Sequence, residues 1–258
     1  MKNFNPTQIP WARAYSRREM LEFMGSAAAV AIFGCGREPT ISGTSFTGLD
    51  LPSTAAAAAV PACVVRPEQT EGPYFVDAKL NRSDIRSEPG DNSIKQGVPL
   101  RLTFQVSRVD GASCSGLSGA MVDVWHCDAL GLYSDVRDPN ADTRGKKFLR
   151  GYQVTHSNGL AEFTTIYPGW YPGRAVHIHF KIRGDSSSQR GFEFTSQLYF
   201  DESITDQVYQ QAPYKTKGRR TTTNDNDSIF RRGGKQLMPA LTKDGQGYAA
   251  KFDIGLRT

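Results

Sequence analysis

Short stretches of alternating apolar and polar residues, separated by turn-forming residues, constrain the fold of this chain most. They are Leu100–Ser107, Ala120–Trp125, Phe148–Thr155, Ala161–Ile166, Val176–Ile182, Phe192–Phe200 and Ala249–Ile254. In the first stretch, Leu102, Phe104 and Val106 recur at every second position, which is the period of a strand with one buried face. Glycine, asparagine, aspartate and proline lie between the stretches, and only Ile204–Gln211 indicates a helix. The pattern predicts an all-β fold, an antiparallel β-sandwich with few short helices.

Residues 1–35 have the features of an export signal and not of that fold. Ser16-Arg17-Arg18-Glu19-Met20-Leu21 is a twin-arginine pattern, and the apolar run Met24–Phe33 is too short to span a bilayer as a helix. The alternative is a chance arginine pair before an apolar stretch. Ile32-Phe33-Gly34-Cys35 is similar to a bacterial lipoprotein box, so lipidation at Cys35 and simple cleavage nearby both stay open. We therefore expect an extracytoplasmic bacterial protein, whether periplasmic, secreted or anchored to the membrane only through Cys35.

The rest of the chain divides into a tether and one domain. Residues 36–62 are rich in glycine, serine, threonine, alanine and proline, which predicts a flexible linker. Residues 63–258 then remain, a normal length for a single β-rich domain. The formal net charge of the chain is only +5, and no basic run is interleaved with aromatic residues. These features argue against nucleic acid as a partner.

Cysteine usage agrees with export without fixing the disulfide connectivity. If Cys35 carries a lipid, Cys63, Cys114 and Cys127 remain, and at most one disulfide bond can form. We expect Cys127 to be structural, although a thiolate there could compete as a soft metal ligand.

Two of the four histidines, His177 and His179, lie two residues apart within the stretch Val176–Ile182. Successive strand side chains point to opposite faces, so both imidazoles share one face and the apolar residues share the other. Taken alone, such a pair is more often an exposed or packed strand feature than a metal site. Its neighbours favour a metal, because Tyr171 lies just upstream and Tyr133 follows a glycine turn, and imidazole is a ligand for zinc, copper, iron and nickel.

Four sequence blocks, in order, resemble those of the intradiol ring-cleavage dioxygenases, the family that includes protocatechuate 3,4-dioxygenase and catechol 1,2-dioxygenase. They are Thr70-Glu71-Gly72-Pro73-Tyr74, residues 119–133, residues 165–174 with His177-Ile178-His179, and Thr195-Ser196-Gln197-Leu198, spanning about half the chain. The resemblance implies the same β-sandwich and a non-haem Fe(III) cofactor. It also implies an enzyme that opens a catechol ring between its two hydroxyl-bearing carbons, inserting both atoms of O2 to give a muconate-type diacid.

The resemblance implies four metal ligands by position. Tyr133 would stay bound, Tyr171 would dissociate when substrate binds and take up a proton, and His177 and His179 would supply two imidazoles. Phenolate oxygens are hard anionic donors that favour Fe(III), and the tyrosine that leaves doubles as a general base. Tyr167 is the rival for the second phenolate. Tyr171 is preferred because the family's ligand lies on the loop just before the arginine and the histidine pair.

Other residues of the site follow from the same resemblance. The Arg174 guanidinium would stabilise negative charge on the substrate ring as oxygen attacks, assisted through hydrogen bonding with Gln197. Gly72, Pro73 and Tyr74 would line the substrate mouth. Without the resemblance, Arg174 is better explained as a solvated loop arginine or a carboxylate partner, and Pro73 and Tyr74 are equally well explained as turn and packing residues.

Two other functions stay open. An exported β-sandwich can be a ligand-binding module with a degenerate metal site, although retention of all four ligands and the arginine argues against this. A zinc hydrolase could use His177 and His179, but it lacks a persuasive third histidine or carboxylate ligand. The sequence leaves open the ring substituents of the substrate, the oligomeric state, and whether residues 221–258 close over the site or complete a sheet.

Overall fold

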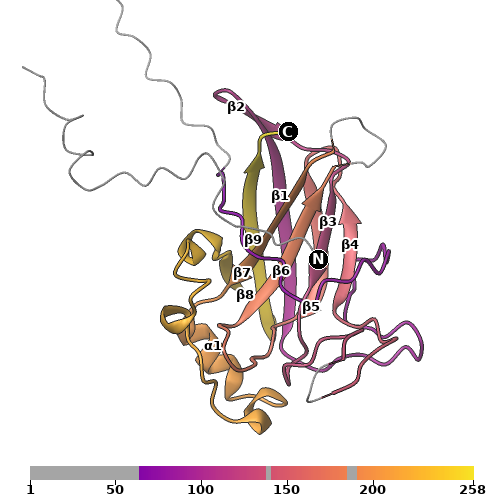
Figure 1. Ribbon diagram of the computed structural model, residues 1–258, viewed down its shortest axis with the longest axis vertical. Coiled ribbons are helices and arrows are strands. Elements are labelled where there is room, and N and C mark those ends of the chain that lie inside the picture. The colour runs from indigo at the N-terminus through magenta and orange to yellow at the C-terminus, as the bar shows by residue number, and fades with distance from the viewer. Residues whose placement is uncertain (1–63, 138–140, 185–190) are drawn as a thin grey trace, which may run out of the picture. The chain divides into compact units, whose positions relative to one another are not determined.

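The computed structural model describes residues 64–137, 141–184 and 191–258, which are the coloured parts of Figure 1. The predicted export signal, the possible lipid site at Cys35 and the predicted linker lie outside these residues. Among the residues described, no helix has the length and apolar character needed to cross a membrane.

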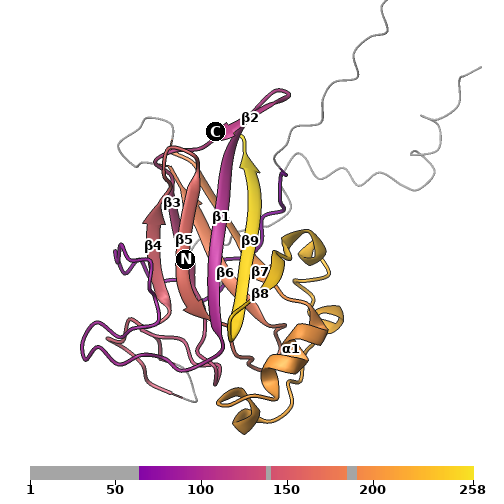
Figure 2. The ribbon, with the colours of Figure 1, turned by 180° about the vertical axis from the view of Figure 1, so that it is seen from behind.

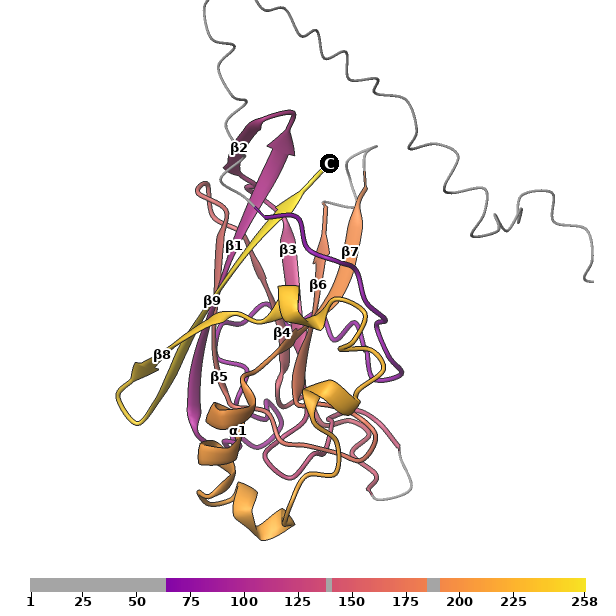
Figure 3. The ribbon, with the colours of Figure 1, turned by 90° about the vertical axis from the view of Figure 1, so that its left-hand side faces the viewer.

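Two β-sheets pack against each other, and Figure 3 shows both layers from the side. The first sheet has the order β2-β1-β9-β8, with β5 also paired to β1, and the second has the order β4-β3-β6-β7. The strands of the first sheet are β1 (Pro99–Asp110), β2 (Ser113–Gly116), β5 (Leu160–Ile166), β8 (Ala240–Asp244) and β9 (Gly247–Leu256). Those of the second are β3 (Met121–Trp125), β4 (Arg150–Val154), β6 (His177–Arg183) and β7 (Glu193–Tyr199). The prediction of a β-sandwich is confirmed.

One pairing departs from the predicted antiparallel arrangement. Strands β1 and β9 pair in parallel, with Leu100 opposite Tyr248 and Arg108 opposite Leu256, whereas the other strand pairs are antiparallel. A parallel neighbour needs a long connection to bring the chain back to the same end of the sheet. The helical excursion after β7 and the short strand β8 lie on the way to β9, so this pairing was not readable from strand periodicity alone.

The core lies between the two sheets. Leu102, Phe104 and Val106 of β1 are fully buried, as their alternation predicts. The Phe104 ring lies 5.2 Å, centroid to centroid, from Phe180 of β6 and 6.0 Å from Phe252 of β9, so one side chain joins both sheets. Full burial of a side chain of this size contributes about 1.5–3 kcal/mol.

Residues 201–238, here called the helical segment, leave the sheets between β7 and β8 and gather beside one end of the sandwich (Figure 2). The segment contains α1 (Glu202–Tyr209) and the 3-10 helices η2 (Tyr214–Lys217), η3 (Asn224–Asn226) and η4 (Gly234–Leu237). Helix α1 begins after Asp201, whose carboxylate accepts hydrogen bonds from the amides of Ser203 and Ile204. The predicted helix at Ile204–Gln211 is therefore present, shifted two residues toward the N-terminus.

His126 fastens the end of β3 to β5 through its buried imidazole. Its Nε2 lies 2.7 Å from Thr165 Oγ1, and its Nδ1 lies 2.8 Å from the carbonyl oxygen of Cys127, to which it donates. The side chain is 1% exposed, and burial lowers the pKa of His126 from 6.5 to about 4. The imidazole is therefore neutral in the folded protein at neutral pH.

Acidification should destabilise the protein through His126. As pH falls, His126 takes up a proton in the unfolded protein before it does so in the folded protein, which favours unfolding. The contribution of the neutral, buried His126 to stability is therefore complete above pH 6.5 and is lost as pH falls through 4. A pKa lowered from 6.5 to about 4 corresponds to about 3 kcal/mol of unfolding free energy. Urea unfolding between pH 7 and pH 4 should show a smaller drop in stability for His126→Gln than for wild type. His156→Gln, at an exposed histidine, should follow wild type; equal drops in all three proteins would contradict this reading.

Candidate metal centre

Two loops and one strand bring two phenols and two imidazoles to one point. Tyr133 lies on the loop after β3, Tyr171 lies on the loop before β6, and His177 and His179 begin β6. Nε2 of His177 lies 3.1 Å from Oη of Tyr171, 3.4 Å from Oη of Tyr133 and 3.0 Å from Nε2 of His179. Tyr171 is half-buried, and the other three side chains are buried. All four residues named as metal ligands from the sequence therefore face one another.

The register of β6 directs the histidines away from the core. His177 pairs with Tyr199 of β7, and His179 pairs with both Trp125 of β3 and Gln197 of β7. On the opposite face of the strand, Ile178, Phe180 and Ile182 are fully buried between the sheets. A slip of one residue would exchange the two faces, so the apolar residues of β6 fix the position of the imidazoles.

Burial keeps both imidazoles neutral, and a hydrogen bond fixes the tautomer of His177. Nδ1 of His177 donates to the carbonyl oxygen of Ala175 at 2.6 Å, which leaves the lone pair of Nε2 facing the phenols. Burial lowers the pKa of His177 to about 3 and lowers that of His179 well below its usual value. Both rings are therefore neutral, which is the form that binds metals. His179 stacks on the Trp125 indole at 5.0 Å, and its buried Nδ1 has no hydrogen-bond partner among the residues described.

The phenols need a positive charge to act as anions here. Burial raises the pKa of Tyr133 and of Tyr171, so both phenols are protonated at neutral pH in the metal-free protein. A bound cation reverses this preference, because it stabilises the anionic form of its ligands. Four lone-pair donors facing one another in a buried position thus fit a metal ion.

The donor set distinguishes between metals. In the parts of the chain that the structure describes, no three histidine, cysteine, aspartate or glutamate side chains are grouped to hold a metal ion. His177 and His179 thus lack the third nitrogen, sulfur or carboxylate ligand that a catalytic zinc site uses. Phenol oxygens complete the set, and such hard anionic donors suit a hard trivalent cation better than a soft one.

Tyr167 lies elsewhere. Its Oη is 2.7 Å from Oγ1 of Thr205 in α1, and its ring is fully buried in the main core. The structure thus places Tyr171, and not its rival Tyr167, beside His177.

The block Gly72-Pro73-Tyr74 lies against the donor residues. Gly72 adopts φ +72°, and a Cβ on it would lie 3.3 Å from Cε1 of His179, so this close approach suits glycine. The Tyr74 ring stacks on Tyr133 with centroids 4.4 Å apart. Pro73 is exposed in the turn between them. Gly72 and Tyr74 therefore form a wall of the centre, and Pro73 lies on its outer side.

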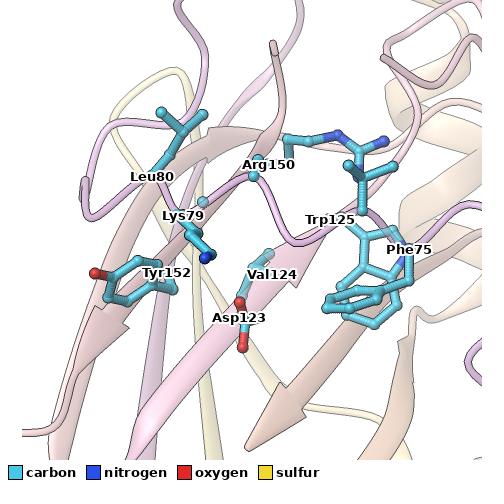
Figure 4. Close-up of a pocket in the computed structure, with 11 residues that line it drawn as sticks. Phe75, Lys79, Leu80, Asp123, Val124, Trp125, Arg150 and Tyr152 are labelled. Carbon is cyan, nitrogen blue, oxygen red and sulfur yellow. The ribbon is translucent and has the colours of Figure 1, made fainter. Parts of the chain in front are cut away.

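Arg150 supports Tyr74 and the loop that carries Tyr133 through hydrogen bonds. Its buried guanidinium donates to the carbonyl oxygen of Tyr74 at 3.1 Å and to Oγ of Ser134 at 2.8 Å, next to Tyr133. Figure 4 shows Arg150, Trp125 and Phe75 around a cavity of about 10 Å³, about the space of one water molecule. Trp125 is one of the residues that line this cavity, and its buried Nε1 has no hydrogen-bond partner among the described residues.

Arg174, on the loop before β6, and Gln197, opposite His179 on β7, form a hydrogen-bonded pair beside the centre. Nη2 of Arg174 donates to Oε1 of Gln197 at 2.5 Å, and Nε2 of Gln197 donates to the carbonyl oxygen of Thr70 at 2.8 Å. Nε of Arg174 also donates to Asp227 at 2.9 Å. The arginine thus has both partners that the sequence left open, the glutamine and a carboxylate. Asp227 was not recognised as that carboxylate, because it lies 53 residues away in an irregular segment.

Cys127 is a packing residue beside the centre. Its Sγ donates to the carbonyl oxygen of Gly169 at 3.4 Å, and burial raises the pKa of Cys127 to about 12. The side chain is therefore a thiol at neutral pH and not the thiolate that would compete as a ligand. Cys114 is disulfide-bonded.

Lys217 joins the two loops that carry the phenols, a role that sequence reasoning missed. Its Nζ donates to the carbonyl oxygen of Trp170, next to Tyr171, at 2.5 Å, and to that of Leu130, close to Tyr133. Gly131 has φ +84°, and a Cβ there would lie 2.2 Å from both Lys217 Nζ and the Trp170 oxygen. The absence of a side chain at Gly131 therefore lets the two loops meet.

Gly131→Ala should force these loops apart and weaken metal binding. Gly145→Ala is a matched control, because Gly145 has φ +82° but no atom within 4 Å of an added Cβ. Positive φ alone costs a non-glycine residue about 1–2 kcal/mol, so both variants should lose that much stability. Only Gly131→Ala should lose more stability and also lose bound metal, as measured by urea unfolding and elemental analysis. Equal behaviour of the two variants would refute the role of this contact.

Comparison with known proteins agrees with the geometry. A family model described as "Dioxygenase" matches residues 70–257. Chlorocatechol 1,2-dioxygenase from Pseudomonas putida is 35% identical over 151 residues, covering 51% of this chain and 52% of the relative. Catechol 1,2-dioxygenase 1 from Acinetobacter lwoffii is 27% identical over 146 residues, covering 50% of this chain and 45% of the relative. This chain thus spans about half the length of these curated relatives.

Solved structures match over more of their length. An intradiol ring-cleavage dioxygenase from Tetranychus urticae has 30% sequence identity and a TM-score of 0.63, covering 76% of this chain and 94% of that one. The dioxygenase domain of a dioxygenase carbohydrate-binding protein fusion from Streptomyces sp. SirexAA-E has 27% identity and a TM-score of 0.52, covering 75% of this chain and 99% of that one. By sequence and by fold, the chain belongs to the intradiol ring-cleavage dioxygenase family.

Proposed function

We propose that this protein is an Fe(III)-dependent dioxygenase that opens a catechol-type ring between its two hydroxyl-bearing carbons and inserts both atoms of O2, giving a muconate-type diacid. The observation that carries the proposal is the convergence of Tyr133, Tyr171 and His179 on Nε2 of His177, at 3.0–3.4 Å. The names of the relatives, catechol and chlorocatechol 1,2-dioxygenases, support the substrate class.

The two phenols and two imidazoles would hold the iron. When bound, ferric iron supplies the Lewis acidity that activates a catechol dianion toward O2. Tyr171 is the half-buried phenol of the pair, so its Oη is the one suited to leave the metal and accept a proton from a substrate hydroxyl. Tyr74, stacked on Tyr133, offers a flat surface to an aromatic ring.

Arg174 supplies positive charge at the centre. Its guanidinium is largely buried and is oriented by Asp227 and Gln197. Such a fixed cation stabilises negative charge that develops on the substrate ring as oxygen attacks.

Arg174→Ala should therefore retain iron and lose rate. Removal of one fixed charge-stabilising donor typically lowers kcat about 10²–10³-fold. Elemental analysis and steady-state oxygen uptake measure the two quantities on the same sample. Arg144→Ala, at an exposed arginine, should behave as wild type. Arg174→Ala with the wild-type rate would remove the arginine from the proposed mechanism.

A panel of substituted catechols tests the activity itself. We expect one O2 consumed per ring opened, with the absorbance of a muconate-type product. Purified protein that lacks a visible ferric-phenolate band and consumes no O2 would instead favour a ligand-binding module with a degenerate metal site.

We also propose that the protein is exported through residues 1–35. The twin-arginine pattern supports this, and that route carries folded proteins that already hold a cofactor. Replacing Arg17 and Arg18 by lysine should retain the protein in the cytoplasm, as measured by cell fractionation. Unchanged export would contradict the twin-arginine assignment.

A further inference from the structure

We propose that Asp227, in the helical segment, is a positioning residue of the metal centre that orients both Arg174 and the backbone supporting His177. This inference deepens the proposed function and depends on it for its kinetic part. Asp227 immediately follows η3, and its carboxylate is 1% exposed.

The two carboxylate oxygens of Asp227 have separate partners. Oδ1 accepts hydrogen bonds from the amides of Ile229 at 2.6 Å and Phe230 at 3.2 Å, which hold the carboxylate in its own turn. Oδ2 accepts from Nε of Arg174 at 2.9 Å and from the amide of Ala175 at 2.8 Å. The carboxylate thus joins the helical segment to the loop that leads into β6.

The first consequence is the orientation of Arg174. With Nε held by Asp227, Nη2 reaches Oε1 of Gln197 at 2.5 Å and Oη of Tyr199 at 3.4 Å. Tyr199 is itself held, because its Oη lies 2.8 Å from Oε1 of Gln69. Asp227 supplies the only carboxylate partner of Arg174 among the residues described, so it also neutralises a charge that is mostly buried.

The second consequence reaches His177. Ala175 is held at its amide by Asp227, and its carbonyl oxygen accepts from Nδ1 of His177 at 2.6 Å. That hydrogen bond selects the tautomer with a free lone pair on Nε2, the atom that faces Tyr171. Asp227 therefore contacts Arg174 directly and supports His177, a proposed metal ligand, through Ala175.

Asp227→Asn keeps the size of the side chain and breaks this arrangement. If the asparagine oxygen stays on the Ile229 side, its NH2 group meets Arg174 Nε and the Ala175 amide, which are both donors. If the amide is flipped, it meets the Ile229 amide instead. Neither orientation of an amide can replace a carboxylate that accepts on both sides.

The test compares four full-length proteins against wild type, by steady-state kinetics on catechol and by the rate of iron release to a ferric chelator. Asp227→Asn should lower kcat/KM about 10–100-fold, mostly in kcat, and speed iron release about 10–100-fold, the usual cost of losing a support of a metal ligand. Arg174→Gln should lower kcat without changing iron release. The double variant should lose less rate than the product of the two single losses, because part of the effect of Asp227 on the rate passes through Arg174.

Asp123→Asn, assayed at pH 8, is the matched control. Asp123 is a buried carboxylate on β3 that accepts hydrogen bonds from Arg183, and it belongs neither to the four donor residues nor to the hydrogen-bond partners of Arg174. It should lower the melting temperature and leave both kcat and iron release unchanged, which separates positioning from general destabilisation.

Rate losses that multiply in the double variant, or wild-type iron release in Asp227→Asn, would overturn the inference. A wild-type protein that holds iron but cleaves no catechol defeats the proposed function alone, since iron release still decides the role of Asp227. A wild-type protein that binds no iron defeats both.

Discussion

His177→Ala should leave a folded protein without iron and without catechol cleavage. Nε2 of His177 is the atom that Tyr133, Tyr171 and His179 all face, so its removal takes away the centre of the donor set. We expect a loss of rate above about 10³-fold, since losing a single charge-stabilising donor already costs about 10²–10³-fold. Oxygen uptake and elemental analysis on the purified variant measure both effects.

His156→Ala is the control for that variant. His156 is exposed in the turn that connects β4 of the second sheet to β5 of the first, and it has no part in the donor set. It should keep wild-type iron and rate. Full activity in His177→Ala would show that the proposed ligand set is wrong.

Tyr171→Phe should abolish turnover while the fold persists. Phenylalanine keeps the ring that packs near Tyr74 and removes only Oη, which lies 3.1 Å from Nε2 of His177. That oxygen is the proposed acceptor of a substrate proton, so its loss removes both a ligand and a base. We expect residual activity below about 1% of wild type, on the scale of general acid–base catalysis, which contributes 10²–10⁴-fold. Oxygen uptake measures the rate, and the visible absorption of the iron-loaded protein should change because one phenolate is lost.

Tyr167→Phe distinguishes the two tyrosines of the same loop. Oη of Tyr167 is hydrogen-bonded to Thr205, so Tyr167→Phe should lose about 1 kcal/mol of stability and keep its activity. If Tyr167→Phe is inactive and Tyr171→Phe is active, the assignment of the second phenolate must be exchanged.

The strands that sequence periodicity revealed are those with one strongly apolar face. Leu102, Phe104 and Val106 predicted β1, and the alternation around His177 correctly placed the imidazoles opposite the core. Strands β2 and β8 were missed, because they are short and mostly exposed, so no apolar alternation marks them. The parallel pairing of β1 with β9 depends on a return path through the helical segment, which leaves no local pattern.

Tyr133, Tyr171, His177 and His179 could be named from the sequence because they lie in short blocks that resemble those of the intradiol ring-cleavage dioxygenases. The residues that support these four, Asp227 and Lys217, could not be named from the sequence. Asp227 meets Arg174 across 53 residues, and Lys217 meets the Leu130 carbonyl across 87. A lone aspartate or lysine in an irregular segment has the same local sequence whether it is solvated or buried against a distant loop. Only the folded chain shows which carbonyl or guanidinium it reaches.

The most direct test of the central claim is a crystal structure of the iron-loaded protein with anomalous scattering recorded at the iron absorption edge. We predict a single strong peak among Oη of Tyr133, Oη of Tyr171 and the Nε2 atoms of His177 and His179. A peak bound by other residues, or iron-loaded crystals with no peak among these four atoms, would contradict the account.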